Sequence, residues 1–183
     1  IGSVLHSKQT HLKVAANLLF TLPGQPYVYY GEELGMLGQK PDEFIREPFL
    51  WGYRQHDRER ARWMKPKYSK SVTVTPLVGQ QNDPNSLYNH YKRLIHFRKS
   101  NAVIGSFYGQ IEPLPNRNPR LVAFKRGLAE QEVWVLHNLS STTVTYSASF
   151  MPTELLLTTN AASHFEKVDT ISLAPFSCVV LGE

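Results

Sequence analysis

The chain has only one cysteine, Cys178, among its 183 residues. A single thiol excludes an internal disulfide and any metal site built from several cysteines. Because Cys178 lies in an apolar run close to the C-terminus, we interpret it as a small core residue.

Long apolar runs are also missing. No stretch reaches the roughly 20 residues that a helix needs to cross a bilayer, so we expect a chain without a membrane segment. The first residues lack the basic and apolar pattern of a signal peptide. The chain begins with Ile1 and not with Met, which leads us to expect a piece of a longer protein. Nothing in the sequence assigns the protein to a cellular compartment.

A strong excess of one charge is missing as well. Lys and Arg number 20 against 15 Asp and Glu, a net charge of +5, and the two signs are interleaved. Basic residues cluster only at residues 58–62 and 65–67, where a solvated loop is the favoured interpretation. Since aromatic and basic residues do not alternate on any one expected strand, we expect no nucleic-acid partner.

The first hundred residues have the pattern of helix and strand segments that is typical of an α/β protein. Residues 5–20 repeat apolar side chains at helical spacing, and Pro23 with Gly24 ends that helix. A short aromatic strand is expected at residues 26–30, and a second helix begins at Asp83, which precedes a proline. One strand cannot close a barrel, so this part predicts a piece of one.

Residues 31–82 have little periodicity and form an unusually long connection for a compact domain. Loops of this length are often functional. Three aromatic residues, Trp51, Trp63 and Tyr68, are the candidate anchors that hold it in place.

The remainder predicts antiparallel β-structure, because short β-branched and aromatic runs alternate with turns. The expected strands are residues 110–114, 121–126, 132–137, 143–147, 154–158, 169–173 and 177–181. The run at residues 133–136 is apolar at every position, so its strand should be central. We place the boundary at residue 102, which divides the chain into an α/β part, residues 1–102, and an all-β part, residues 103–183.

Two stretches carry a resemblance to a known family. Residues 22–36 read LPGQPYVYYGEELGM and residues 40–51 read KPDEFIREPFLW. They resemble the last barrel strand and the following loop of the α-amylase family of glycoside hydrolases, most closely its α-glucosidase and oligo-1,6-glucosidase-like members and related α-amylases. Residues 81–99 are similar to the final barrel helix, and residues 133–140 to a strand of the C-terminal β-domain.

The resemblance implies a C-terminal fragment: the last helix-strand-helix of a (β/α)8 barrel, followed by an antiparallel β-sandwich domain. It implies a retaining enzyme that acts on α-glucosidic bonds of α-glucans or oligosaccharides through paired carboxylates. In the family those acids lie upstream, one of them in an Asn-His-Asp segment that this chain lacks. We therefore expect no catalytic residue here and no activity of the chain alone.

Three residues are the substrate-binding candidates that the resemblance implies. Arg46 corresponds to an arginine that reaches the sugar at the pocket floor and pairs with an upstream aspartate, although the family's Arg-x-Pro-Met-x-Trp loop has Phe49 in place of Met here. Glu33 and Tyr30 are expected to support the pocket rim. The alternative for Arg46 is an ion pair with Glu43 or Glu47 in solvent.

A second reading makes the β-part a carbohydrate-binding or purely structural module, with Trp134, Tyr146, Phe150 and Phe165 as candidate sugar-stacking residues. We expect no metal site or cofactor in this chain. Calcium is compatible with the full-length enzyme, through regions absent here. The expected partners are the α-glucan or oligosaccharide substrate and the missing N-terminal barrel portion, or a second copy that covers the apolar faces of residues 12–30.

Overall fold

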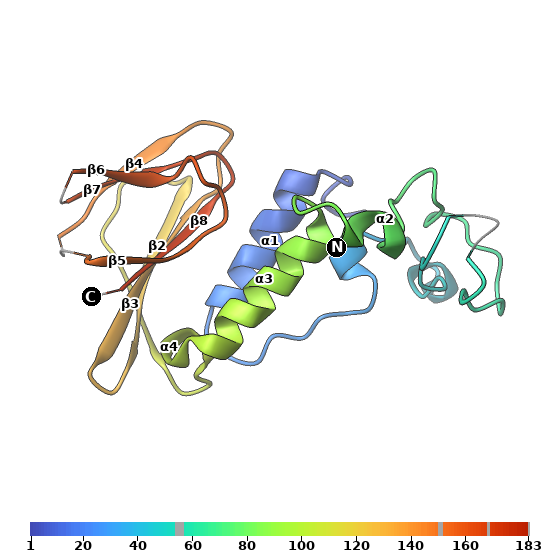
Figure 1. The fold of residues 1–183 in the computed structure, drawn as a ribbon, viewed down its shortest axis with the longest axis horizontal. Coiled ribbons are helices and arrows are strands. Elements are labelled where there is room, and N and C mark those ends of the chain that lie inside the picture. Colours follow the sequence, from blue (N-terminus) through green and yellow to red (C-terminus); the bar gives the residue numbers. More distant parts are fainter. Residues whose placement is uncertain (54–56, 150–151, 168, 183) are drawn as a thin grey trace. The chain divides into compact units, whose positions relative to one another are not determined.

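A computed structural model describes residues 1–53, 57–149, 152–167 and 169–182 (Figure 1). The chain divides into two compact units. The first, here called the loop unit, contains residues 1–13 and 27–93, and the second, the sheet unit, contains residues 14–26 and 94–183. The helices α1 (Gln9–Thr21) and α3 (Leu87–Ser100) each contribute residues to both units.

The sheet unit is built from two antiparallel sheets. The larger has the order β1 (Gln110–Pro113), β2 (Leu121–Leu128), β3 (Gln131–Asn138), β8 (Cys178–Gly182), β5 (Glu154–Thr158). The smaller has the order β4 (Val144–Ser147), β7 (Thr170–Leu173), β6 (His164–Lys167). Figure 1 shows β4, β6 and β7 as a layer separate from β2, β3 and β8.

The two sheets enclose one apolar core. Trp134 and Leu136 of β3 face it together with Tyr146 of β4 and Leu173 of β7. The alternate residues of β3, such as Val135, pack on the opposite face of the larger sheet against α4 (Ala102–Gly105). Because successive side chains of a strand point to opposite faces, a strand buried on both faces must be apolar throughout. The central position expected for this strand is confirmed.

Two buried arginines tie the end of α1 into the sheet unit. Arg98 of α3 donates to the carbonyl oxygens of Phe20 (2.7 Å) and Leu22 (3.0 Å), and Arg126 of β2 donates to that of Thr21 (2.9 Å). The last carbonyls of a helix have no partner within it. The two guanidinium groups therefore satisfy the end of α1, whose predicted stop before Pro23 is confirmed.

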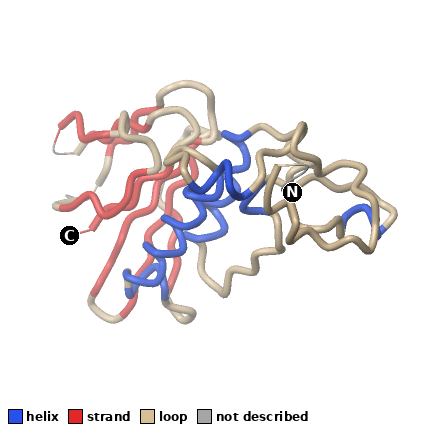
Figure 2. Tube along the Cα trace, turned by 45° about the vertical axis from the view of Figure 1, so that its right-hand side comes forward, coloured by secondary structure: helices blue, strands red, loops and turns tan. Residues whose placement is uncertain are grey.

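The loop unit has little regular structure, as its long tan segments in Figure 2 show. Besides parts of α1 and α3 it contains η1 (Glu32–Leu34), η2 (Asp42–Ile45) and α2 (Leu77–Gln81). Leu34, Leu50 and Val74 form a small buried cluster. Nearby, the side-chain amide of Gln80 donates to the carbonyl oxygens of Leu34 and Thr75, both at 2.9 Å.

The long loop is held mainly by a carboxylate. The side chain of Glu47 is 2% exposed and accepts hydrogen bonds from the backbone N–H groups of Lys67 (2.6 Å), Tyr68 (2.8 Å) and Ser69 (2.7 Å). The aromatic anchors expected from the sequence do not have this role: Trp51 and Trp63 are exposed and Tyr68 is half-buried. A buried carboxylate satisfies several N–H groups at once, which an aromatic ring cannot do.

Several elements differ from those expected. The helix expected at residues 5–20 begins at Gln9, and α2 and α4 lie where no helix was expected. Residues 26–30 form no strand, since strands exist through hydrogen bonds to neighbouring strands and the described residues offer this segment none. The helix expected from Asp83 begins at Leu87, and Ser86 caps it by accepting from the N–H of Asn89 (3.1 Å). The strand β6 had no counterpart among the expected strands.

Among the described residues, no helix is both long and apolar enough to span a membrane.

Candidate functional site

A cavity of about 340 Å³ lies beside the segment that the sequence singled out. Tyr29, Tyr30, Gly31 and Glu32 line one part of it, and residues from the N-terminal turn and from residues 36–47 line the rest. Gly31 has φ 86°, a left-handed conformation that favours glycine, and it lets the chain turn directly into η1. All of the lining residues belong to the loop unit.

Tyr30, the first of the three candidates, lines this cavity. Its hydroxyl donates to the carbonyl oxygen of Glu47 (3.3 Å), and its ring lies 4.7 Å from that of Tyr29. Burial raises the pKa of the Tyr30 hydroxyl, so the group stays protonated and remains a donor. Tyr30 thus ties the cavity wall to the backbone of Glu47, the residue whose side chain holds the long loop.

Glu33, the second candidate, does not line the cavity. Burial raises the pKa of its carboxyl group, and its Oε2 atom is buried without a hydrogen-bond partner in the described part of the chain. A buried carboxylate oxygen without a donor is costly. The role of Glu33 as a support of the pocket rim stays a prediction.

Arg46, the third candidate, extends into solvent. Its Nη2 atom is 3.2 Å from Oδ2 of Asp42, and about 60% of each of the two side chains is exposed. An exposed pair contributes little to stability. Neither Glu43 nor Glu47 is the partner that the solvent-paired alternative expected. Arg46 follows Ile45 and precedes Glu47, which both line the cavity, so its backbone lies at the cavity edge.

The rings of Phe49 and Trp51 pack against each other. Their ring centroids are 4.5 Å apart; Phe49 is half-buried, whereas Trp51 is 42% exposed. The Trp51 ring therefore presents a free surface that a sugar ring could use.

The described residues contain no group of three His, Cys, Asp or Glu side chains that could hold a metal ion. His90 of α3 is buried, and burial together with the charges of Lys13 and Arg93 lowers its pKa to about 3.

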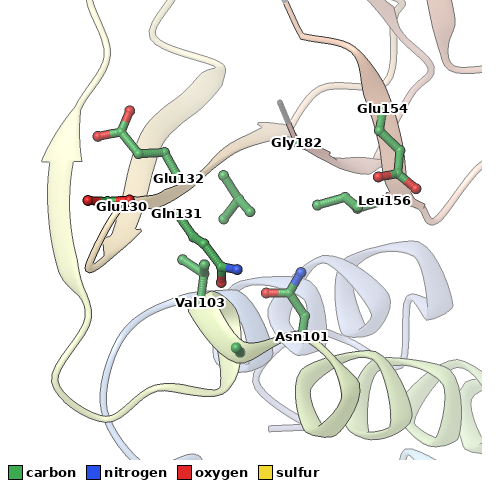
Figure 3. A pocket seen from close by; sticks show the side chains of 10 residues that line it. Asn101, Val103, Glu130, Gln131, Glu132, Glu154, Leu156 and Gly182 are labelled. Atoms are coloured by element: carbon green, nitrogen blue, oxygen red, sulfur yellow. The ribbon is translucent and has the colours of Figure 1, made fainter.

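Two of the four sugar-stacking candidates of the β-part are buried and not presented on its surface. Trp134 and Tyr146 are each only 5% exposed and belong to the core between the sheets. Phe150 lies outside the described residues, and so does the side chain of Phe165. The sheet unit has a cavity of about 280 Å³ whose lining contains no aromatic ring. Figure 3 shows the side chains that line it, among them Asn101, Glu132 and Leu156.

Glu47 is a central residue of this site that was not among the candidates from the sequence. Its only signal was its place in the EPF sequence directly after Arg46, where an acidic residue precedes a proline and a long polar loop. Only the folded chain shows that its carboxylate accepts three hydrogen bonds from residues about 20 positions away.

Comparison with known proteins gives matches along nearly the whole chain. A family model described as the catalytic domain of alpha amylase matches residues 1–106, and one described as the C-terminal domain of alpha-amylase SusG matches residues 121–180.

Individual relatives agree with these matches. Alpha-amylase 3 of Dictyoglomus thermophilum is 35% identical over 170 residues, which cover 92% of this chain and 33% of that protein. Alpha-amylase SusG of Bacteroides thetaiotaomicron is 38% identical over 102 residues, 54% of this chain and 14% of that protein. The crystal structure of an alpha-amylase from H. orenii has a TM-score of 0.84 at 32% identity, covering 98% of this chain and 36% of that one. The chain thus spans about a third of the length of the first relatives it matches.

Proposed function

The chain belongs to the α-amylase family, and from this premise we propose that it is part of a retaining glycoside hydrolase acting on α-glucosidic bonds of α-glucans or oligosaccharides. The family and the fold class predicted from the sequence, a partial (β/α)8 barrel followed by an antiparallel β-sandwich domain, are confirmed by the family matches and the similar structure. The division at residue 102 stays a prediction.

The observation that supports the proposal most is the cavity beside Tyr30. It lies within residues 1–106, the part that matches the catalytic-domain model, and its edge carries the backbone of Arg46. A guanidinium group binds a carboxylate and a sugar hydroxyl at once because its donors form a planar fork. We propose that Arg46 exchanges Asp42 for an upstream carboxylate and the substrate when the rest of the barrel is present.

The chain by itself should be inactive. Retaining cleavage needs two carboxylates about 5 Å apart, one to attack and one to protonate the leaving oxygen. The chain of 183 residues should give no turnover of maltose, starch or a chromogenic α-glucoside above buffer. Turnover by the chain alone would contradict this part of the proposal.

The activity is tested on the protein extended by the residues that precede Ile1. We expect hydrolysis of the chromogenic α-glucoside with the α-anomer as first product, followed by NMR. Arg46→Ala should lower kcat/KM by about tenfold or more, the effect of one lost charge-assisted hydrogen bond. The matched control is Arg117→Ala, an exposed arginine of the sheet unit, which should leave kcat/KM unchanged. A β-anomer as first product would overturn retention.

The alternative is a carbohydrate-binding or structural β-module. Titration of the chain with maltoheptaose distinguishes it from the proposed function. Trp134 is buried, so we expect no saturable change in tryptophan fluorescence from the β-part. Saturable binding that survives Trp51→Ala would favour the module.

We further propose that the partner of the loop unit is the missing barrel portion and that the isolated chain self-associates in its absence. Tyr27, Val28, Tyr29 and Tyr30 are 81%, 40%, 50% and 44% exposed, a contiguous apolar segment without strand partners in the described part of the chain. Sedimentation should show concentration-dependent oligomers. Calcium, where the full-length enzyme binds it, should be held outside this chain, so that chelation leaves the unfolding midpoint of these 183 residues unchanged.

A further inference from the structure

The loop unit holds a second, larger cavity, of about 710 Å³, at the basic cluster noted in the sequence. Arg58, Arg60 and Arg62 line it, and so do two lysines from the following segment, Lys65 and Lys70. Lys67, which belongs to the same cluster in the sequence, does not line it; its ammonium group lies over the rings of Phe44 and Tyr68 instead. The fold therefore selects five cations and directs them to one cavity.

These cations are not neutralised by ion pairs. In the described part of the chain, none of the five forms an ion pair with a carboxylate, whereas Arg46 and Lys125 do. Five like charges around one cavity repel one another and raise the local concentration of anions. A ligand with negative charge would remove that repulsion.

Arg60 is held in place by the fold. Its Nη2 atom donates to the carbonyl oxygens of Pro48 (3.0 Å) and Ser69 (2.7 Å). Its Nε atom is buried and has no hydrogen-bond partner among the described residues. The guanidinium group is thus oriented in advance and keeps a donor free.

The lining also contains one carboxylate, Asp57, which distinguishes between anionic ligands. Both of its oxygens are buried without a hydrogen-bond partner in the described part of the chain. A bare phosphate would be repelled by this group, whereas a hydroxyl group would donate to it. Leu50, Met64 and Val72 supply apolar surface for C–H groups.

Phosphate, hydroxyl and C–H groups occur together in a phosphorylated sugar, and the cavity has the volume of typical small-molecule sites. We propose that this cavity binds a sugar phosphate, with the phosphate at the arginines and a sugar hydroxyl at Asp57. The sugar part of the ligand rests on the proposed function, whereas the anion-binding part does not. The site lies on the same long loop as Arg46, in the loop unit.

The test is calorimetric titration of the 183-residue chain with glucose 6-phosphate, inorganic phosphate and glucose. We expect glucose 6-phosphate to bind with a Kd of about 1 mM or tighter, inorganic phosphate at least about tenfold more weakly, and glucose not at all. Raising the salt concentration should weaken the binding, since exposed charges contribute to it.

Arg58→Gln combined with Arg62→Gln should weaken glucose 6-phosphate binding by about tenfold or more, because two charge-assisted contacts are lost. Both side chains are exposed, so the variant should fold. The control removes the same charge elsewhere, by Arg117→Gln combined with Arg120→Gln, two exposed arginines of the sheet unit, and should bind like the original chain.

Equal weakening in both variants, or no binding of glucose 6-phosphate to the original chain, would overturn the proposal. Equal affinity for inorganic phosphate would overturn the assignment to a sugar phosphate. None of these results bears on hydrolysis of neutral α-glucosides by the extended protein, so failure of this inference and failure of the proposed function are distinguishable.

Discussion

The two units of this chain are stabilised in different ways. The sheet unit has apolar cores on both faces of its larger sheet, with regular hydrogen bonding between strands. The loop unit contains a small apolar cluster and relies on single polar side chains, above all Glu47 and Gln80, that satisfy backbone groups. Most of the exposed large apolar side chains, Tyr27 and Trp63 among them, belong to the loop unit.

This difference between the two units indicates which of them can carry a ligand site. A segment fixed by a few polar contacts tolerates irregular backbone and exposed aromatic rings, which ligand sites need. A segment fixed by a two-faced core does not. Both candidate ligand sites described above lie in the loop unit.

The largest effect is expected in the sheet unit. Leu136→Ala should lower the free energy of unfolding by about 4 kcal/mol, because Leu136 is fully buried and the cavity left behind cannot collapse. Urea unfolding measures the loss, which should fall on the amides of β2, β3 and β8 in hydrogen exchange. Leu155→Ala on β5, where the side chain is 40% exposed, is the control and should cost less than about 1 kcal/mol. Equal costs would mean that the core between the sheets is not the stabilising feature.

In the loop unit the largest effect should come from a polar residue. Glu47→Gln should destabilise the long loop by about 2–3 kcal/mol, since the three backbone donors lose a charged acceptor. Amide exchange at Lys67, Tyr68 and Ser69 should accelerate by about 30- to 150-fold. Glu43→Gln, at an exposed position of η2, is the matched control. Unchanged exchange in both variants would refute the assigned role.

Lowering the pH should reduce the stability of the sheet unit through one buried histidine. His137 is fully buried, its Nε2 atom is 3.0 Å from Oγ1 of Thr21, and burial lowers its pKa from 6.5 to about 3. In the unfolded chain the His137 imidazole takes up a proton near pH 6.5, whereas in the folded chain it stays neutral at that pH. Stability from this group is therefore complete above that pH and is lost as the pH falls toward the folded pKa, by about 2 kcal/mol between pH 7 and pH 5.

His137→Gln should make the unfolding free energy less dependent on pH in that range. His90 of the loop unit has a pKa lowered to the same value of about 3, but the charges of Lys13 and Arg93 contribute to it besides burial. Salt should therefore reduce the acid sensitivity due to His90 and leave that due to His137 unchanged. Identical salt responses of the two single His→Gln variants would contradict this difference between the units.

The smallest effects are expected at two helix caps, one in each unit. Ser86 caps α3 through the N–H of Asn89 (3.1 Å), and Asn101 caps α4 through that of Ile104 (2.9 Å). Ser86→Ala and Asn101→Ala should each cost about 1 kcal/mol in thermal unfolding. Equal costs would show that local capping is worth the same in both units and that their difference lies in long-range contacts.

Much of the sheet unit could be predicted from the sequence because strands carry a local pattern. The continuous apolar run in β3 indicates that this strand is central, and the structure confirms it. β6 was missed because residues 164–167, which read HFEK, have only one apolar position among them. The site was less predictable, since the acceptor role of Glu47 depends on backbone groups some 20 positions away.

The sequence by itself determined the family, the stop of α1 at Pro23 and the order of strands along the chain, because these depend on local composition and short motifs. Only the tertiary structure decided that Glu47 holds the long loop, that Trp134 is buried, and that three arginines of residues 58–62 line one cavity. The physical reason is that burial, hydrogen-bond partners and converging charges arise between residues that are distant in sequence, and no local pattern records them.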